Sequence, residues 1–400
     1  MLDDSVVIVG AKRTPMGAFQ GELAGVSAPQ LGAVVIAGAL QQAGVAPDSV
    51  DEVLMGNVLS AGLGQAPARQ AALAAGMSSA VPCTTVSKVC GSGMKAVMFA
   101  CDLVRGGNAR VVVAGGMESM SNAPYLLPKA RAGHRIGHGQ VLDHMMLDGL
   151  EDAYEIATDG ARRSMGTFGE DCAETFRFTR AMQDEFAIAS VMRAQEAAKS
   201  GAFASEIAPV DVSTRNGSTR IDADEGPRRI KVDKIPALKP AFKNDGTITA
   251  ASSSSINDGA AALVVMSASE AKARGLKPLA RVMGWSAHAQ DPSWFTTAPI
   301  HAMEKLYAKT GWEPTDVDLF EINEAFAVVP MAAMKAHRIP HEKMNVHGGA
   351  CALGHPIGSS GARIIVTLLT AMQRRTAKRG VASICIGGGE ATAIALEMVG

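Results

Sequence analysis

A cysteine at position 90 lies between a β-branched run and glycines, in the stretch VSKVCGSGMKAV (86–97). Gly91 and Gly93 are followed by a helix-like segment, so the cysteine is placed where a helix begins. Backbone N–H groups and the helix dipole at such a place favour a thiolate, and we expect a lowered pKa for the Cys90 thiol. Glycines beside it would let a thioester approach closely. The alternative is a buried, inert cysteine.

Two further stretches carry reactive side chains among glycines. His355 lies in NVHGGACALGHPIGSSGAR (345–363), where it can serve as a base or a hydrogen-bond donor; the alternative is a structural turn histidine. Cys385 ends an apolar run and begins CIGGGE (385–390). The N–H groups around Gly387 could form an oxyanion hole, or the glycines could simply make a tight turn between strands.

A fourth stretch, INEAFA (322–327), places Asn323 at the exit of a predicted strand. An asparagine there can hold a water molecule or a carbonyl oxygen. It can also cap a helix that begins at Glu324. Both roles are compatible with one another.

The elements that position these residues are duplicated. AGVAPDSVDEVLMGNV (43–58) and TGWEPTDVDLFEINEA (310–325) share glycine, proline, valine and aspartate in one frame without a gap. RVVVAGGMES (110–119) echoes VASICIGGGEA (381–391), and the segment beginning at Cys90 echoes the one beginning at His355. These echoes predict two α/β halves packed as a pseudo-symmetric pair, which would bring Cys90 and His355 to a common centre as an activated nucleophile.

Between the halves lies a segment of different character. We predict an N-terminal half of residues 1–121 plus 247–274, a loop domain of residues 122–246 and a C-terminal half of residues 275–400. The end of the loop domain, 226–243, is strongly basic. It is either a solvated charged loop or a local phosphate-binding rim.

Composition narrows the class of protein. A length of 400 residues, an apolar fraction of 47% and a net charge of −1 indicate a multi-unit globular protein and argue against a nucleic-acid-coating one. No apolar run reaches membrane-spanning length, and the first residues lack the basic region of a secretory signal. Six cysteines without C-x₂-C spacing predict neither a disulfide scaffold nor a zinc site. We therefore expect a reducing, cytoplasmic setting.

Taken together, these motifs resemble those of the thiolase family, in its acetoacetyl-CoA thiolase (acetyl-CoA C-acetyltransferase) branch. The resemblance covers essentially the whole chain and rests on VCGSGMKAV, AGGMESMSNAPY, NEAFA, GGACALGHPIGSSGAR and CIGGGE in the family's order. It implies duplicated, layered α/β halves (αβαβα) with an inserted loop domain. It further implies a homo-oligomer, a dimer or a tetramer.

The resemblance also implies roles. Cys90 would carry the acyl group, and His355 would activate the Cys90 thiol. His355 would also bind the thioester oxygen of the second substrate, together with a water held by Asn323. Cys385 would remove a proton from the acetyl-CoA methyl, and the N–H groups of Cys90 and Gly387 would bind the oxyanion. Acetyl-CoA, acetoacetyl-CoA and CoA are then substrates, and no metal or redox cofactor is implied. The residues implied in CoA binding are Leu150, Met165, Arg228 (or Arg229), Phe242, Ser254, Ala325 and Phe326.

Three departures from the family pattern bear on substrate length. Ser164 stands where many members have histidine, the stretch 151–163 is about six residues longer, and ASSSS (251–255) replaces a more usual glycine-containing tract. Phe295 matches a position near the acyl pocket, where its bulk would favour short chains if it points inward. Otherwise it anchors its loop.

Other functions stay open at this point. A degradative 3-ketoacyl-CoA thiolase of broader chain length would share every motif. A Cys–His–Asn thioester hydrolase or a decarboxylating condensing enzyme would not need Cys385 as a carbon base. A CoA- or lipid-binding protein would need none of the reactive residues intact.

Overall fold

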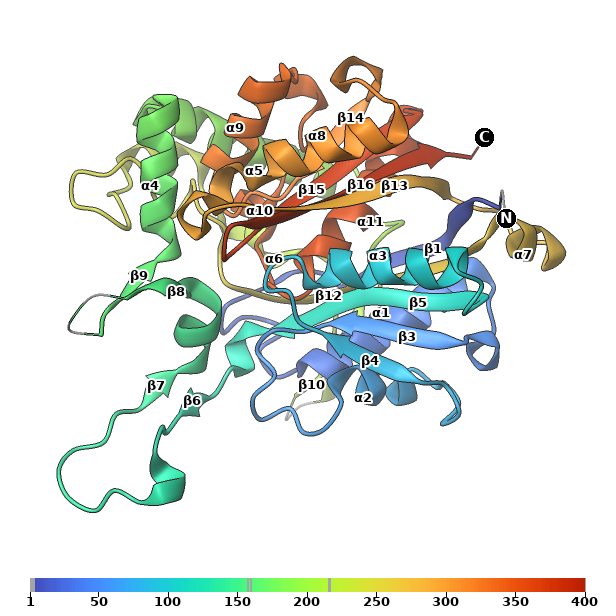
Figure 1. Ribbon diagram of the computed structural model, residues 1–400, viewed down its shortest axis with the longest axis horizontal. Helices are drawn as coiled ribbons and strands as arrows, with labels where there is room; N and C mark the ends of the chain where they lie inside the picture. The colour runs from blue at the N-terminus through green and yellow to red at the C-terminus, as the bar shows by residue number, and fades with distance from the viewer. Residues whose placement is uncertain (1–3, 157, 159, 215–216, 400) are drawn as a thin grey trace.

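Two half-sheets and three helical layers build the molecule (Figure 1). The computed structural model describes residues 4–156, 158, 160–214 and 217–399, so the predicted domain ends at 1 and 400 lie outside it. The strand order of the main sheet is β14-β15-β16-β13-β1-β12-β5-β3-β4. The strands are β1 (Val6–Arg13), β3 (Glu52–Gly56), β4 (Cys83–Val86), β5 (Val111–Ser119), β12 (Asn257–Ser267), β13 (Ala280–Ala289), β14 (Leu319–Ile322), β15 (Arg379–Ile386) and β16 (Glu390–Met398), with β2 (Gly17–Ala18) paired to β12.

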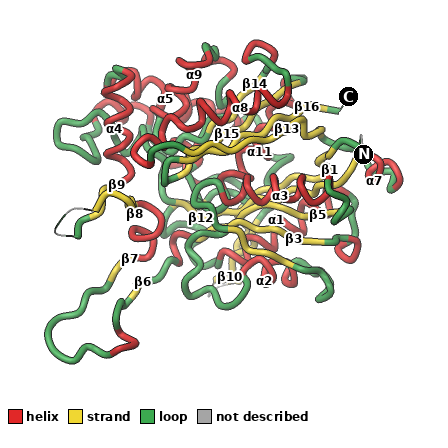
Figure 2. Tube along the Cα trace, viewed as in Figure 1, coloured by secondary structure: helices red, strands yellow, loops and turns green. Residues whose placement is uncertain are grey.

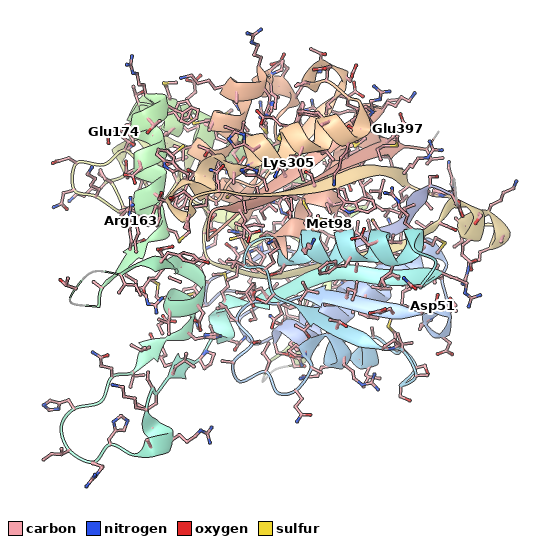
Figure 3. All side chains as sticks on the ribbon, in the orientation of Figure 1. Asp51, Met98, Arg163, Glu174, Lys305 and Glu397 are labelled. Atoms are coloured by element: carbon pink, nitrogen blue, oxygen red, sulfur yellow. The ribbon has the colours of Figure 1, made fainter. Side chains whose placement is uncertain are left out.

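Helices cover both faces of each half-sheet. The helices α3 and α11 form the central layer, and Met98 of α3 lies between the two half-sheets (Figure 3). The helices of the halves are α1 (Ala28–Ala43), α2 (Pro67–Ala74), α3 (Ser92–Arg105), α7 (Ala268–Ala273), α8 (Ala298–Thr310), α9 (Val328–His337), α10 (Ala350–Leu353) and α11 (Ser360–Arg375). The helix α11 is buried on all sides from Ser360 to Met372, as expected for an interior helix. The predicted layered α/β architecture is confirmed.

The duplication is visible in the strand order, which is the same when read outward from the centre. On one side run β1, β12, β5 and β3, and on the other β13, β16, β15 and β14. The repeated aspartates have the same task in both halves. The Asp51 carboxylate accepts the backbone N–H of Val111 at the start of β5, and Asp318 accepts that of Arg379 at the start of β15, both within 2.9 Å.

Small residues let the two central helices approach closely. A Cβ atom on Gly93 would lie 2.8 Å from the Ala362 nitrogen, and one on Gly361 would lie 2.5 Å from the Met94 nitrogen. Gly93 therefore faces Ala362 where the two helices meet. The helices begin at Ser92 and Ser360, 268 residues apart, so the expected match of Cys90 to His355, 265 apart, is wrong by three residues. His355 lies in the loop before α11, not at the position equivalent to Cys90.

The middle segment contains smaller elements and a projecting arm. Its elements are β6 (Tyr125–Leu126), β7 (Leu142–Asp143), β8 (Glu151–Ile156), β9 (Arg162–Ser164), α4 (Met165–Phe176), α5 (Arg180–Lys199), β10 (Val210–Thr214), β11 (Gly217–Ile221) and α6 (Glu225–Arg229). The arm between β6 and β7 extends away from the body, largely as loop (Figure 2). The division at 121/122, 246/247 and 274/275 stays a prediction. None of the helices within the described ranges is long and apolar enough to cross a bilayer.

A buried cluster of ion pairs connects the middle segment to strand β1. Arg13 of β1 contacts Glu206 at 2.5 Å and Asp224 at 2.6 Å, and the side chains of all three are fully buried. A second hydrogen bond from Arg13 to Asp224 measures 2.9 Å, which makes the contact bidentate. Removing one partner of such a cluster leaves the remaining charges buried without compensation.

We predict that Arg13→Ala lowers the free energy of unfolding by about 3–5 kcal/mol, because two buried carboxylates lose their partner. Equilibrium denaturation in urea measures the change. Arg110→Ala is the matched control: its side chain is 71% exposed, 3.7 Å from Asp51, and little change is expected. Equal losses for both variants would contradict the structural role given to the buried cluster.

Candidate active site

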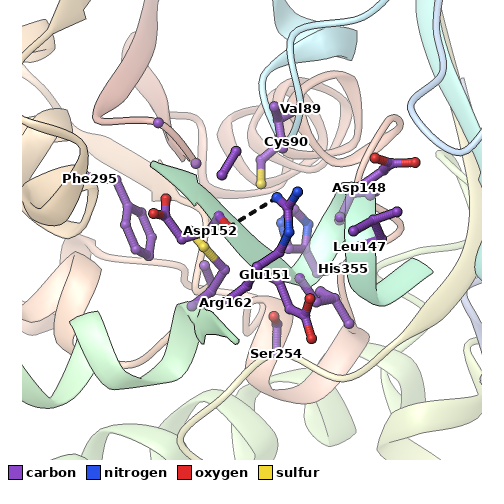
Figure 4. A pocket seen from close by; sticks show the side chains of 18 of the residues that line it. Val89, Cys90, Leu147, Asp148, Glu151, Asp152, Arg162, Ser254, Phe295 and His355 are labelled. Atoms are coloured by element: carbon purple, nitrogen blue, oxygen red, sulfur yellow. Dashed lines mark hydrogen bonds between the residues drawn. The ribbon is translucent and has the colours of Figure 1, made fainter. Parts of the chain in front are cut away.

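One pocket of about 230 Å³ collects residues from both halves and the middle segment (Figure 4). Cys90 and Val89 come from the turn before α3, and His355 and Ile357 come from the loop before α11. Gly387 and Gly388 come from the turn between β15 and β16. The remaining wall includes Leu150, Tyr154, Arg162, Met165, Ser254, Phe295, Ala325 and Phe326. The sequence analysis placed most of these residues near one site, and the fold brings them together.

A strained turn presents Cys90. Val89 has a φ of 45°, in the left-handed region that β-branched residues rarely occupy. The hydroxyl of Ser92 holds this turn by donating to the Val89 carbonyl at 2.7 Å and accepting the Lys88 N–H at 2.8 Å. Strain of this kind gathers at functional sites, where the surrounding structure over-determines it. Here it directs the Cys90 side chain into the pocket.

The Cys90 thiol differs from the sequence expectation. Burial raises the pKa of Cys90 to about 11, and the opposing N–H groups of Gly387 and of Cys90 itself only partly offset this. The expected lowering is therefore wrong, because Cys90 precedes the helix by two residues and its thiol loses solvation in a partly buried position. A proton acceptor beside the sulfur is needed to form the thiolate.

His355 has the properties of that acceptor. Its Nδ1 lies 2.5 Å from the hydroxyl of Ser360, and that hydroxyl donates its own proton to the Pro356 carbonyl at 2.9 Å. The hydroxyl must then accept from Nδ1–H, which leaves a lone pair on Nε2. Nε2 is buried without a hydrogen-bond partner among the described residues. Burial and the nearby Arg363 lower the pKa of His355 to about 3, so the imidazole is neutral.

Sequence reasoning missed Ser360 as a functional residue. It lies five positions after His355, at the first turn of α11, and fixes the tautomer of the imidazole. The available signal was a serine within the glycine-rich loop. That signal becomes informative only when the loop folds back onto the helix.

Cys385 and Asn323 are not among the residues that line the pocket. Cys385 is the penultimate residue of β15 and packs in the apolar cluster that contains Met165 and Phe295. Burial raises its pKa well above the usual value, and the neighbouring Cys90 raises it further. The buried amide of Asn323 has no side-chain hydrogen-bond partner within the described residues. The expected helix beginning at Glu324 is wrong, since α9 begins at Val328.

Most residues proposed for CoA contact line the pocket: Leu150, Met165, Ser254, Ala325 and Phe326. Phe242 lies outside the wall and supports it, with its ring 5.7 Å from that of Phe326 and at 86° to it. Phe295 is in the wall, buried and edge-to-face with Phe168.

Arg228 does not line this pocket. Its guanidinium pairs with Glu22 at 2.6 Å and bonds the Asp224 carbonyl. Its neighbour Arg229 lines a second cavity of about 470 Å³ together with Lys231 and Lys234. The basic segment therefore contributes to a cavity wall through Arg229, which pairs with Glu225 at 2.7 Å, and not through Arg228. The phosphate-rim interpretation stays a prediction.

The site combines a cysteine on a strained turn, a neutral histidine with a free lone pair and a backbone N–H directed at the sulfur. These are the groups that acyl transfer through a covalent thioester requires. Comparison with models of known protein families supports an acyl-transfer enzyme. Residues 6–269 match the model of the thiolase N-terminal domain, and residues 276–398 match that of the thiolase C-terminal domain. The chain belongs to the thiolase family.

Relatives of similar length exist in distant organisms. The chain is 49% identical over 401 residues to an acetyl-CoA acetyltransferase of Schizosaccharomyces pombe, with 100% of each chain covered. It is 52% identical to acetyl-CoA acetyltransferase 2 of Arabidopsis thaliana, covering 98% of this chain and 97% of that one. An acetyl-CoA acetyltransferase of Cupriavidus necator is 49% identical, over 98% and 99% of the two chains.

We predict that alkylation of Cys90 by iodoacetamide speeds up about tenfold per pH unit from pH 7 to pH 9 without reaching a plateau. The reason is that a pKa of about 11 keeps the thiol protonated over this range, so the thiolate fraction grows with each unit. Mass spectrometry of the Cys90 peptide measures the rate, and Cys90→Ser corrects for other thiols. A plateau below pH 8 would show a thiolate already formed at neutral pH.

We predict that Ser360→Ala slows acylation of Cys90 by an acyl-CoA about 10–100-fold with little change in KM, since Nδ1 loses the group that fixes its tautomer. Rapid-quench measurement of CoA release reports this step. Ser359→Ala is the matched control, because the buried Ser359 hydroxyl has no partner among the described residues. Full activity of the Ser360 variant would show that Ser360 does not position the His355 imidazole.

Proposed function

We propose that this protein is an acetyl-CoA C-acetyltransferase. It joins two acetyl-CoA molecules into acetoacetyl-CoA and CoA, and it catalyses the reverse thiolytic cleavage. The observation that carries the proposal is the convergence of Cys90, His355 and the Gly387 turn on one pocket, with Cys385 packed beside it. The names of the full-length relatives support the same activity.

The first half-reaction transfers an acyl group to Cys90. The Nε2 lone pair of His355 accepts the thiol proton, and the sulfur attacks the thioester carbonyl. The N–H groups of Cys90 and Gly387 bind the oxyanion that forms. The bond to CoA then breaks, and the departing CoA thiolate takes a proton from Cys385. This leaves acyl-Cys90, an imidazolium at His355 and a thiolate at Cys385.

The second half-reaction forms a carbon–carbon bond. The Cys385 thiolate removes a proton from the methyl group of acetyl-CoA. A buried thiolate whose pKa is raised by its surroundings is a strong base, which this weak carbon acid requires. The imidazolium and a water held by Asn323 bind the enolate oxygen. The enolate carbon attacks acyl-Cys90, and the leaving Cys90 sulfur recovers its proton from His355.

CoA thioesters are substrates in this scheme, and none of its steps uses a metal or redox cofactor. Phe295 in the pocket wall supports short acyl chains. The pantetheine arm is proposed to pass Ser254, Phe326 and Met165. The CoA phosphates are proposed to lie toward the cavity of Arg229, Lys231 and Lys234.

We further propose a cytoplasmic setting, because both catalytic thiols must stay reduced. A dimer or tetramer remains our expectation for the assembly.

Thiolysis of acetoacetyl-CoA by the purified protein, against longer 3-ketoacyl-CoA substrates, tests the proposed activity. A preference for acetoacetyl-CoA is expected. Equal or greater rates with long chains would instead identify a degradative thiolase of broad chain length.

We predict that Cys385→Ala separates the two half-reactions. Condensation and thiolysis should fall by about 10³-fold, since the carbon base is lost, while acylation of Cys90 should stay within about tenfold of wild type. Condensation is followed by acetoacetyl-CoA formation and acylation by the mass of the Cys90 peptide. Cys101→Ala, another fully buried cysteine, is the control and should retain both steps. Unchanged condensation in the Cys385 variant would refute the assigned role.

A further inference from the structure

The longer stretch between Leu150 and Met165 forms a hairpin of β8 and β9 that reaches the reactive pocket. Residues 157 and 159 in this stretch lie outside the described residues. From the described part, Glu151, Asp152, Ala153, Tyr154 and Arg162 line the same pocket as Cys90 and His355. Figure 4 shows the Arg162 guanidinium pointing into the pocket, toward the end where Cys90 lies.

The Arg162 guanidinium has no ion-pair partner among the described residues. Its one hydrogen bond there is a long contact of 3.4 Å to the Asp152 carbonyl, drawn in Figure 4. Guanidinium groups carry five donors in a planar fork that fits a carboxylate bidentately. Within the described residues, Arg162 therefore brings to the pocket a guanidinium without an ion pair and with unused donors.

The acids of the same pocket wall are directed elsewhere. The Asp152 carboxylate accepts the N–H groups of Tyr154 and Glu155 within its own turn, at 2.8 and 2.5 Å. The Asp148 carboxylate contacts Nδ1 of His144 at 2.6 Å. Glu151 extends away from the Arg162 guanidinium in Figure 4 and makes no ion pair with it. None of the three makes an ion pair with Arg162 in the part of the chain that the structure describes.

We infer that Arg162 is a specificity-determining residue that recognises an acyl group ending in a carboxylate. The inference rests on the proposed function and extends its substrate class from acetoacetyl-CoA to 3-oxoacyl-CoA esters of short dicarboxylic acids. Arg162 lies in the pocket that holds the acyl-carrying sulfur, whereas Arg229, Lys231 and Lys234 line the other cavity. Its position suits the acyl end of the substrate better than the CoA phosphates.

Thiolytic cleavage of such a substrate leaves the acyl group that carries the terminal carboxylate covalently bound to Cys90. In thiolysis of 3-oxoadipyl-CoA, Cys90 attacks the C3 carbonyl and the bond between C2 and C3 breaks. The C2 carbanion takes a proton from Cys385 and leaves as acetyl-CoA, and the succinyl group stays on Cys90. The Cys385 thiolate then removes the thiol proton of CoA, CoA attacks the thioester and releases succinyl-CoA, and the Cys90 sulfur recovers its proton from the His355 imidazolium. The terminal carboxylate is thus present throughout the covalent stage, within the pocket that Arg162 lines.

The experiment compares two acyl donors that differ in the terminal group. Succinyl-CoA and butyryl-CoA have the same four-carbon acyl skeleton, and only the first ends in a carboxylate. The rate of Cys90 acylation by each is read from the mass of the Cys90 peptide. We expect wild type to favour succinyl-CoA, and Arg162→Ala to lower the succinyl-to-butyryl ratio by about tenfold or more. Arg162→Lys should keep part of the preference, since it keeps the charge and loses the fork.

Arg163→Lys is the matched control on the same hairpin, because it keeps the positive charge that pairs with Asp171. Arg163 pairs with Asp171 and Glu155, stacks on Phe168 and lies beside α4, outside the pocket (Figure 3). This variant should leave the ratio unchanged. An equal loss for both donors in Arg162→Ala would assign the residue to CoA itself and overturn the inference. An unchanged ratio would overturn it as well.

Thiolysis of acetoacetyl-CoA keeps the two proposals apart. If wild type and Arg162→Ala both cleave acetoacetyl-CoA while the succinyl preference is absent, the specificity inference fails and the proposed function stands. If wild type cleaves neither acetoacetyl-CoA nor 3-oxoadipyl-CoA, the proposed function fails and the specificity inference fails with it.

Discussion

The close approach of α3 and α11 is the constraint on which the site depends. Both helices lie between the half-sheets, and their contact is made by Gly93 and Gly361 against the backbone of the partner helix. Any side chain at these positions would collide with backbone atoms and force the helices apart. The segments that present Cys90 and His355 lead directly into these helices. The distance between the halves is therefore also what sets the distance between nucleophile and base.

Buried carboxylates hold the loop that carries His355 from both ends. Glu118 of β5 accepts the N–H groups of Val58, Leu59 and Gly358 at 2.9–3.1 Å, and burial raises its pKa to about 7. Glu324 accepts the N–H of Cys351 at 2.9 Å and the hydroxyl of Ser190 at 2.7 Å. The loop has few side chains large enough to pack by themselves. Hydrogen bonds to fixed carboxylates replace that packing and give a glycine-rich segment one conformation.

The sequence was sufficient for the architecture, because repeated strand and turn patterns are local features of the sequence. The roles of the reactive residues stay predictions, although the fold brings Cys90, His355 and Gly387 to one pocket. The repeated Gly–Pro–Asp frame predicts equivalent strands, and Asp51 and Asp318 do hold equivalent strand starts. Properties that arise from distant contacts were not predictable. The pKa of Cys90 depends on how completely the other half encloses it, and the position of Arg228 depends on Glu22, which lies 206 residues away in the chain. Ser360 gained its role only through the fold of the loop that contains it.

The two halves carry the reactive residues, whereas the middle segment contributes other residues of the pocket wall. This difference follows from how each part is connected to the central helices. Cys90 and His355 lie on segments that enter α3 and α11, the two helices between the half-sheets, so their relative position depends on the central layer. The hairpin of β8 and β9 is closed by its own strand pairs, Glu151–Ser164 and Ile156–Arg162. An ion pair between Arg163 and Asp171 connects it to α4. Lengthening such a hairpin alters which side chains face the acyl group without displacing α3 or α11. Under the inference for Arg162, the reaction and the choice of acyl group would rest on different parts of the fold. Arg162, which makes no ion pair within the described residues, lies on the hairpin and not on the segments that enter α3 and α11.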